Sequence, residues 1–403
     1  MVRLSPEVQE QLLGRPVRAV LGAADWLALA RERVLITGAG GSVGSELARQ
    51  IAACGPDRLV LLDHSEYALF QIERALRDRH PALQIEAVLG DVSRRADLRA
   101  ACTALAPHVI YHAAAYKHVT MTERAIVPAL RTNVLGTLEA ARAARAAGAR
   151  FVLISSDKAA DPHSVMGATK RLAEVITMSL ASESFRPVAV RFGNILGSSG
   201  SLVEIMARCV DEGRNIPITH PDATRFFMTA EEAVSLVLKT DLIGRHVPPH
   251  GASVHRGDPG AEVYWLDMGA PVRIGDLADR FIACATPPGQ APVGIEVMGL
   301  RPGEKMREEL TTQGQVMQST AHPSIWSARQ RPVHPNVVAA AVRTVRRAVR
   351  SGAASDALAA LQAVVVEFEA SATAVTAARA TQRAAARLRD SRFVNRDCLS
   401  IRG

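Results

Sequence analysis

The 403-residue sequence predicts an α/β protein built on a doubly wound parallel sheet. Two observations carry this prediction. Short runs of aliphatic and β-branched residues alternate with stretches of helical periodicity, and at this spacing the strands are joined by helical crossovers and run parallel. The first run is followed by a glycine-rich turn and a helical pattern, in RVLITGAGGSVGSELARQIAACG. With 48% apolar residues, the chain can bury a sizeable core, and its length favours two packed lobes.

The remaining elements follow in chain order. Further strands are expected in DRLVLLDHSE, IEAVLGDVSR, HVIYHAAAY, RFVLISSDK and PVAVRFGNILG, and helices in DLRAACTALA and TNVLGTLEAARAARAAG. We expect an N-terminal arm at 1–30 and the sheet domain at 31–194. From 195 the alternation loosens and Gly and Pro increase, so 195–332 is expected to form mainly a smaller mixed α/β lobe, with some elements returning to the sheet. Within it we expect a polar loop at 246–260 and a strand in EVYWLDMG at 262–269.

Residues 333–403 form an Ala- and Arg-rich tail. Apolar and Arg positions alternate at helical spacing over 335–389, which predicts one or two amphipathic helices. The expected apolar face contains Val337, Val338, Val342, Val345 and Val349. Such a face needs a partner surface, so we expect the tail to serve assembly rather than chemistry.

Charge and composition narrow the class of protein. The net charge is +8, and about six of these excess charges lie from Arg343 to the C-terminus, which favours a solvated helical face over a nucleic-acid site. Contact with a membrane surface or a polyanion is the alternative. No run approaches the roughly 20 apolar residues of a membrane span, and the N-terminus lacks a signal-peptide core, so a cytoplasmic protein is expected. Five widely spaced cysteines favour neither a disulfide framework nor a metal site.

The motif TGAGGSVG, from Thr37 to Gly44, predicts a dinucleotide site. Its glycines at 38, 41 and 44 permit a tight turn, close approach to a pyrophosphate, and packing of a helix whose N-terminal amides face that anion. Asp63 ends the next strand, where a carboxylate bonds ribose hydroxyls and repels a 2′-phosphate. NAD is therefore favoured over NADP. The nearby basic residues Arg58 and His64 are the argument for NADP, because they could contact a 2′-phosphate. Asp91 and Val92, after the third strand, are expected near the adenine.

Several blocks, in order, resemble one family: TGAGGSVGSE, HAAAYKHV, NVLGT, SSDKAADPHSVMGATK, RFGNILGSSGS, THPDATRFFMT, LDMG and LRPGEK. They look like the nucleotide-diphosphate-sugar 4,6-dehydratases of the extended short-chain dehydrogenase/reductase superfamily. They are most similar to the CapD-like polysaccharide-biosynthesis branch that acts on UDP-N-acetylglucosamine. The resemblance covers about residues 10–330 and implies a Rossmann lobe with a smaller UDP-sugar lobe. Many larger members carry membrane helices ahead of this region, and we expect none here.

The resemblance implies a dehydration without net oxidation. A hydride leaves sugar C4 for NAD⁺, which makes a 4-ketone and acidifies the C5 proton. Loss of that proton expels the C6 hydroxyl, and the hydride then returns to C6. Such a reaction needs a base near C5 and an acid near O6.

The stretch SSDKAADPHSVMGATK supplies candidates for these roles. In the family pattern Asp157 is the acid toward O6 and Lys158 the base at C5, and we expect burial and the cation of Lys170 to favour loss of the Lys158 proton. Lys170 would also hold the nicotinamide ribose. Met166 stands where related redox enzymes have a proton-accepting Tyr. In having Met at this position, the sequence is similar to the family members that retain configuration at C5. Ser156 would then relay the C4 hydroxyl proton to water or to Asp157.

Further contacts are carried over from the resemblance. On the cofactor side they add Ser42, Val43, Ala113 and Ala114. On the UDP-sugar side, Tyr116, Lys117 and His118 would line the sugar pocket, Asn194 would bond the diphosphate, Arg225 and Arg301 would neutralise it, and Glu304 would hold the uridine ribose. His112 is expected to be a packed core histidine. A homo-oligomer is expected.

Other functions remain open. A UDP-sugar 4-epimerase would share the fold and the cofactor, but it normally needs the missing Tyr. A UDP-sugar 5,6-dehydratase, or a dehydratase that also epimerises C5, would differ only in how the intermediate is released. A non-catalytic NAD-binding regulator would also lack the Tyr, but it would have no reason to keep Asp157, Lys158 and the UDP-sugar residues together.

Overall fold

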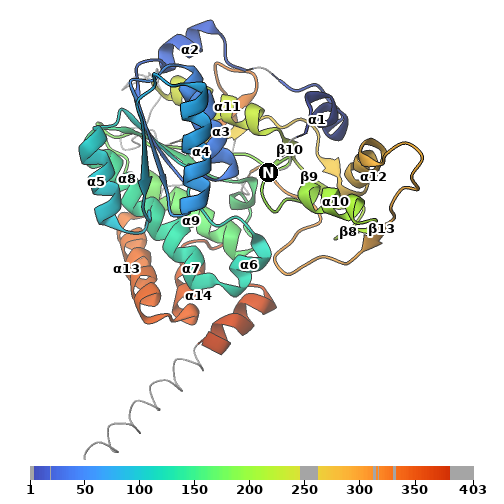
Figure 1. Ribbon diagram of the computed structural model, residues 1–403. Coiled ribbons are helices and arrows are strands. Elements are labelled where there is room, and N and C mark those ends of the chain that lie inside the picture. The colour runs from blue at the N-terminus through green and yellow to red at the C-terminus, as the bar shows by residue number, and fades with distance from the viewer. Residues whose placement is uncertain are drawn as a thin grey trace, which may run out of the picture.

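The centre of the protein is a nine-stranded sheet with strand order β14-β15-β11-β6-β5-β4-β1-β2-β3 (Figure 1). The computed structural model describes residues 4–18, 20–245, 262–311, 315, 317–329 and 333–381. The strands are β1 Arg33–Thr37, β2 Arg58–Asp63, β3 Ile85–Leu89, β4 Val109–His112, β5 Arg150–Ile154, β6 Val188–Arg191, β11 Glu262–Leu266, β14 Gln318–Ser319 and β15 Ile325–Arg329. From β3 to β11 all neighbours are parallel, and β15 and β14 add an antiparallel edge. The predicted doubly wound parallel sheet is confirmed.

Helices cover both faces of the sheet, which is why its strands read as continuous apolar runs. Successive strand side chains point to opposite faces. Val34 and Ile36 of β1 belong to the core under α3 Ser42–Ala53, α4 Glu66–Arg79 and α11 Ala230–Arg245, whereas Leu35 belongs to the opposite core. That second face is covered by α5 Arg95–Leu105, α8 Thr137–Ala147 and α9 Val165–Ser179. No helix in the described part of the chain is long and apolar enough to cross a membrane.

The smaller lobe lies to one side of the sheet (Figure 1). Its elements are α10 Leu202–Asp211, α12 Ile274–Ala285 and short strand pairs, namely β7 Asn194–Ile195 with β10 Phe227–Met228, β8 Ile216–Ile218 with β13 Ile295–Val297, and β9 Thr224–Arg225 with β12 Val272–Arg273. Leu12 and Leu13 of α1 Pro6–Leu13 join its core. Helix α2 Ala23–Leu29 instead packs with the sheet domain through Leu29. Within 195–332, α11, β11 and β15 belong to the large sheet and its cover, and the predicted polar loop at 246–260 lies outside the described residues.

The tail folds back on its own chain. It contains α13 Pro335–Ser351, α14 Ala354–Gln362 and a third helical segment at 372–381, so the prediction of one or two helices was too low, and the rest of 335–389 lies outside the described residues. Gly352, with φ +72°, ends α13 in a left-handed conformation and separates it from α14. Figure 1 shows α13 and α14 lying next to α9 and α7 Ile126–Ala129. Val338, Val342 and Val345 are buried in this contact and Val349 packs against it, whereas Val337 is exposed, so this chain itself covers the expected apolar face except at Val337.

Candidate active site

A cavity of about 1140 Å³ opens where the carboxyl ends of the parallel strands meet the smaller lobe. The predicted residues that line it are Gly38, Gly41, Ser42, Val43, Gly44, Ala113, Tyr116, Lys117, His118, Ser156, Lys158, Met166, Lys170, Asn194, Arg225, Arg301 and Glu304. The predicted residues outside its lining are Asp63, Asp91, Val92, Ala114 and Asp157. Segments far apart in the sequence thus form one continuous site.

The glycine-rich loop before α3 is shaped by close backbone approach. Gly38 has φ +70°, and a Cβ there would lie 2.6 Å from the Ala114 nitrogen. A Cβ on Gly44 would lie 2.0 Å from the Gly38 carbonyl oxygen, so neither position accepts a side chain. Asp63 anchors the loop, because its Oδ2 accepts from the Gly40 N–H at 2.9 Å and its Oδ1 from the Ser65 N–H at 2.9 Å. The result is a backbone cradle at a helix N-terminus, which suits a pyrophosphate.

Three predicted cofactor residues lie outside the cavity lining and contact the loops around it, namely Asp91, Val92 and Ala114. The Asp91 carboxylate accepts from the Ser93 N–H at 2.8 Å, and Val92 is buried beneath Gly136. Ala114 supplies the backbone against which Gly38 packs. In the described structure their side chains therefore shape the loops around the cavity, and adenine contact stays a prediction.

Ser156, Asp157 and Lys158 follow β5 as one hydrogen-bonded group. The Asp157 Oδ1 accepts from the Ser156 hydroxyl at 2.9 Å and from the Lys158 ammonium at 3.1 Å. Its Oδ2 is buried and accepts no hydrogen bond from the described part of the chain. Asp157 itself is only 1% exposed, so Ser156 and Lys158 present this group to the cavity.

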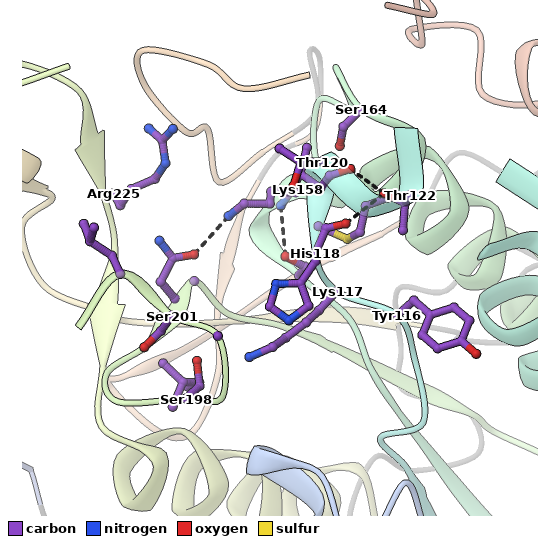
Figure 2. A pocket seen from close by; sticks show the side chains of 18 of the residues that line it. Tyr116, Lys117, His118, Thr120, Thr122, Lys158, Ser164, Ser198, Ser201 and Arg225 are labelled. Carbon is purple, nitrogen blue, oxygen red and sulfur yellow. Dashed lines mark hydrogen bonds between the residues drawn. The ribbon is translucent and has the colours of Figure 1, made fainter. Parts of the chain in front are cut away.

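Glu308 is a member of this group that sequence reasoning missed. Its carboxylate lies 3.4 Å from the Lys158 Nζ and 3.5 Å from the Arg225 Nε, and Asn194 accepts from the same ammonium at 3.1 Å. Figure 2 shows Lys158 extending toward the side of the cavity that carries Arg225. The only sequence signal was the position of Glu308 three residues after the LRPGEK block, far from Lys158 along the chain.

The charge state of Lys158 differs from the expectation. Burial lowers its pKa, but the carboxylates of Asp157 and Glu308 outweigh burial, and the net effect raises the pKa of this ammonium. The nearby cation that opposes them is Arg225 rather than Lys170. Burial thus acts in the expected direction, but the effect expected of Lys170 comes from Arg225, and in the free protein the two carboxylates outweigh both.

Met166 and Lys170 enter the cavity from the first turns of α9. Met166 is buried, and its thioether can neither store nor donate a proton. The Lys170 ammonium donates to the Ile154 carbonyl at 2.7 Å, and burial lowers its pKa to about 8, although Glu174 acts in the opposite direction. The geometry leaves Lys170 beside the end of β5, where an ammonium can meet a ribose hydroxyl.

His112 is a packed core histidine, as expected. It is 1% exposed, its Nδ1 lies 2.7 Å from the Thr37 hydroxyl, and its Nε2 lies 3.1 Å from the Thr137 hydroxyl. Burial, followed by the charge of Lys170, lowers its pKa to about 3. A histidine that stays neutral and is held at both nitrogens is part of the scaffold.

The segment Tyr116 to His118 lines the cavity from the strand β4 side. Asn133 holds it by bonding the Tyr116 backbone twice, at 2.8 and 3.0 Å. Asn133 belongs to a π-helical turn, Leu130–Gly136, within the segment expected to be a regular helix. Such turns often occur at functional sites. Burial lowers the pKa of Lys117, and burial and Lys117 together lower that of His118.

The predicted diphosphate and ribose residues already have partners in the described structure. Arg225 is buried and donates to the carbonyls of Lys305 and Thr224, both at 2.7 Å, so it holds the loop that follows Arg301. Arg301 pairs with Glu304 at 2.7 Å at the cavity rim. A ligand that uses Arg301 must therefore displace or share the Glu304 carboxylate.

The family profile described as "Polysaccharide biosynthesis protein" matches residues 34–330. The chain belongs to this family. It is 37% identical over 324 residues to the capsular polysaccharide biosynthesis protein CapD of Staphylococcus aureus, covering 79% of this chain and 52% of CapD. It is 42% identical over 297 residues to the probable polysaccharide biosynthesis protein EpsC of Bacillus subtilis, covering 72% of this chain and 47% of EpsC. The chain thus spans about half the length of these relatives.

Other family relatives and solved structures agree with this assignment. The UDP-N-acetylglucosamine 4,6-dehydratase (inverting) of Campylobacter jejuni is 27% identical over 286 residues, covering 69% of this chain and 77% of that protein. Pen from Bacillus thuringiensis superposes with a TM-score of 0.65 at 27% identity, covering 76% and 89% of the two chains. DesIV from Streptomyces venezuelae, a dTDP-glucose 4,6-dehydratase solved with NAD, has a TM-score of 0.58 at 20% identity over 70% and 88%, and it supports the fold alone. The chain is therefore related to nucleotide-sugar dehydratases and epimerases.

Proposed function

We propose that this protein is an NAD-dependent hydro-lyase that converts a UDP-N-acetylhexosamine, with UDP-N-acetylglucosamine as the first substrate to test, into its 4-keto-6-deoxy derivative. The observation that carries the proposal is the Ser156–Asp157–Lys158 group, which reaches the same cavity as the glycine-rich cradle. The relationship to the Campylobacter dehydratase supports the choice of substrate class.

The residues present fit a dinucleotide. Gly38 and Gly44 allow the close backbone packing of the glycine-rich loop, and Gly41, Ser42 and Val43 line the cavity at the N-terminus of α3, where its first backbone N–H groups suit a pyrophosphate. Asp63 lies at the end of β2, where its carboxylate favours a free 2′-hydroxyl over a 2′-phosphate. Bound NAD⁺ would accept a hydride from sugar C4 and later return it to C6.

Lys158 and Asp157 provide the acid and the base as one pair. In the free protein they form an ion pair at 3.1 Å. A sugar that displaces water from the cavity disfavours both charges, so a proton can move from the ammonium to the carboxylate. The resulting neutral amine removes the C5 proton, and the resulting carboxylic acid supplies the proton with which the C6 hydroxyl leaves as water. The Lys158 ammonium formed in this step would return a proton to C5 when the hydride reaches C6, and the amine would then regain a proton from solvent, which balances the C4 hydroxyl proton that is released.

The C4 hydroxyl proton also needs an exit in this scheme, and the proposal for it concerns Met166 and Ser156. Met166 lines the cavity in place of a proton acceptor, so the proton must leave by another group. The Ser156 hydroxyl also lines the cavity and lies 2.9 Å from Asp157 Oδ1. We propose that Ser156 passes this proton to solvent, because a hydroxyl relays a proton without storing it.

The test is an NMR time course of the purified protein with NAD⁺ and UDP-N-acetylglucosamine in D₂O. We expect a 4-keto-6-deoxy sugar with deuterium at C5 and retained configuration, while absorbance at 340 nm stays nearly flat. NADH that accumulates in step with product would identify an ordinary dehydrogenase. A C4 epimer that keeps its C6 hydroxyl would identify an epimerase, and a released 5,6-ene would identify a 5,6-dehydratase.

A further inference from the structure

The C-terminal tail touches the scaffold of the cavity through a buried carboxylate. Resting on the function proposed above, we infer that Ser371 is a positioning residue that acts through Glu123 on the start of α9, the helix that carries Met166 and Lys170. The tail is therefore part of the active-site framework.

Glu123 joins three segments behind the cavity wall. It belongs to α6 Val119–Arg124 and is 1% exposed. Its Oε1 accepts from the Val165 N–H at 2.7 Å, and its Oε2 accepts from the Ser371 hydroxyl. Gly303, in the loop between Arg301 and Glu304, packs so closely that a Cβ there would lie 3.1 Å from the same Oε1. A shift of this carboxylate would therefore be felt in α6, in α9 and in the cavity-rim loop.

The contact with Val165 falls where it controls side chains in the cavity. Val165 is the first residue of α9, and its N–H is one of the donors that the helix itself leaves unpaired. A carboxylate at this end is also stabilised by the helix dipole. Met166 and Lys170 lie within the next two turns, and both line the cavity. Glu123 thus fixes the end of α9 from which these two side chains are placed.

The position of the Ser371 hydroxyl is fixed by buried neighbours in the tail and by a backbone hydrogen bond. Phe368 and Ala374, on either side of it, are 3% and 0% exposed and belong to the core that the tail forms with α7 and α9. The Ser371 oxygen also accepts from the Ala374 N–H at 3.1 Å, so the hydroxyl is oriented by the start of the helical segment at 372–381.

Helix α9 is also connected to the cavity through its buried carboxylate Glu174. The Arg171 Nη1 lies 3.4 Å from the Glu174 Oε2, and Glu174 accepts from the Ser155 hydroxyl at 2.6 Å. Ser155 lines the cavity one residue before Ser156, so a displacement of α9 reaches the Ser156–Asp157–Lys158 group as well as Met166 and Lys170.

The experiment compares Ser371→Ala with Ser371→Thr and with a matched control, Ser351→Ala. The Ser351 hydroxyl bonds the Arg347 carbonyl of its own helix at 3.0 Å, so its loss changes the tail without touching Glu123. Amide hydrogen exchange of residues 165–170 in the full-length protein reports the start of α9 and needs no substrate. Steady-state kinetics with UDP-N-acetylglucosamine report its effect on turnover.

We expect Ser371→Ala to speed exchange over 165–170 about fivefold or more. We expect its kcat to fall about tenfold while KM changes less than about twofold, because the misplaced groups act on the reacting atoms. Ser371→Thr should restore both quantities, and Ser351→Ala should leave both unchanged. The inference is overturned when Ser371→Ala matches Ser351→Ala in exchange and kcat.

The two proposals fail in different ways. Wild-type protein that makes no dehydrated sugar, with faster exchange in Ser371→Ala alone, rejects the proposed function and keeps the positioning role. Wild-type protein that does make the product, with equal exchange in both variants, rejects the positioning role alone.

Discussion

Asp63 offers a direct test of how the site selects its cofactor. Its two oxygens are fixed by the N–H groups of Gly40 and Ser65, both at 2.9 Å, so the carboxylate cannot swing away from an approaching charge. Two like charges about 4 Å apart repel by roughly 4 kcal/mol at an effective dielectric near 20. Solvent will reduce that repulsion. A remainder of about 1.4 kcal/mol is still tenfold in affinity.

We therefore expect NAD⁺ to bind about tenfold more tightly than NADP⁺, or better. Asp63→Asn removes the charge but keeps one oxygen as an acceptor for the loop, so the two affinities should come within about threefold of each other. Calorimetric titration of each cofactor measures the ratio, and Asp57→Asn, before the start of β2, is the control for loss of a remote carboxylate. Equal affinities in the wild type, or an unchanged ratio in Asp63→Asn, would refute the reasoning.

Four further predictions concern the site and the tail. Glu308→Gln removes one of the two carboxylates that raise the pKa of Lys158. In the pH profile of C5 deuterium exchange, the limb that reports Lys158 should therefore move to lower pH. A limb that does not move would count against the assignment of Lys158 as the base. Met166→Ala should keep measurable dehydration, whereas Lys158→Ala should abolish C5 exchange and product together, and equal complete loss in two folded variants would reveal an unrecognised role for Met166. Burial depresses the pKa of Lys170 from 10.5 to about 8, so between these values the unfolded chain binds a proton that the native state lacks. Stability should rise there by up to about 1.4 kcal/mol per pH unit, and denaturant titrations of Lys170→Met should lack this contribution. Val345→Ala, at a site with 0% exposure in the tail core, should lower the free energy of unfolding by about 2 kcal/mol in urea titrations, and a change near zero would show that the tail is loosely attached.

The sequence was sufficient for the sheet because its signals are local. The strands from β1 to β6 and the glycine-rich loop follow from periodicity and from turn chemistry within a few residues. The π-helical turn at Leu130–Gly136 was not predicted, because the spacing of apolar residues there is also that of an ordinary helix, and the bonds from Asn133 to the Tyr116 backbone cannot be read from local sequence. The number of tail helices was left open at one or two because helical spacing continues on both sides of Gly352, and the third segment at 372–381 was not distinguished.

The residues of the candidate site were predicted more completely than the protonation state of Lys158. Seventeen of the predicted residues line one cavity, because the carboxyl ends of parallel strands meet at one edge of the sheet. Glu308 could not be assigned, since its contact with Lys158 joins loops about 150 residues apart in the chain. The same holds for Ser371 and Glu123, whose contact exists only after the tail folds back on α9.

The two lysines of the cavity show why those distant contacts decide the chemistry. Burial acts on both, and alone it would lower both pKa values. Lys170 faces a carbonyl and follows burial, so it exchanges its proton near pH 8. Lys158 faces the carboxylates of Asp157 and Glu308 and keeps its proton, so it can become a base only by giving that proton to a neighbour. When the surroundings of two similar groups separate their pKa values in this way, one site can hold an acid and a base at the same pH. The dehydration proposed here therefore depends on the Asp157–Lys158 pair as a unit. Glu308 stabilises the Lys158 ammonium, so its charge sets how far the loss of water must lower the pKa of Lys158 before the proton moves to Asp157.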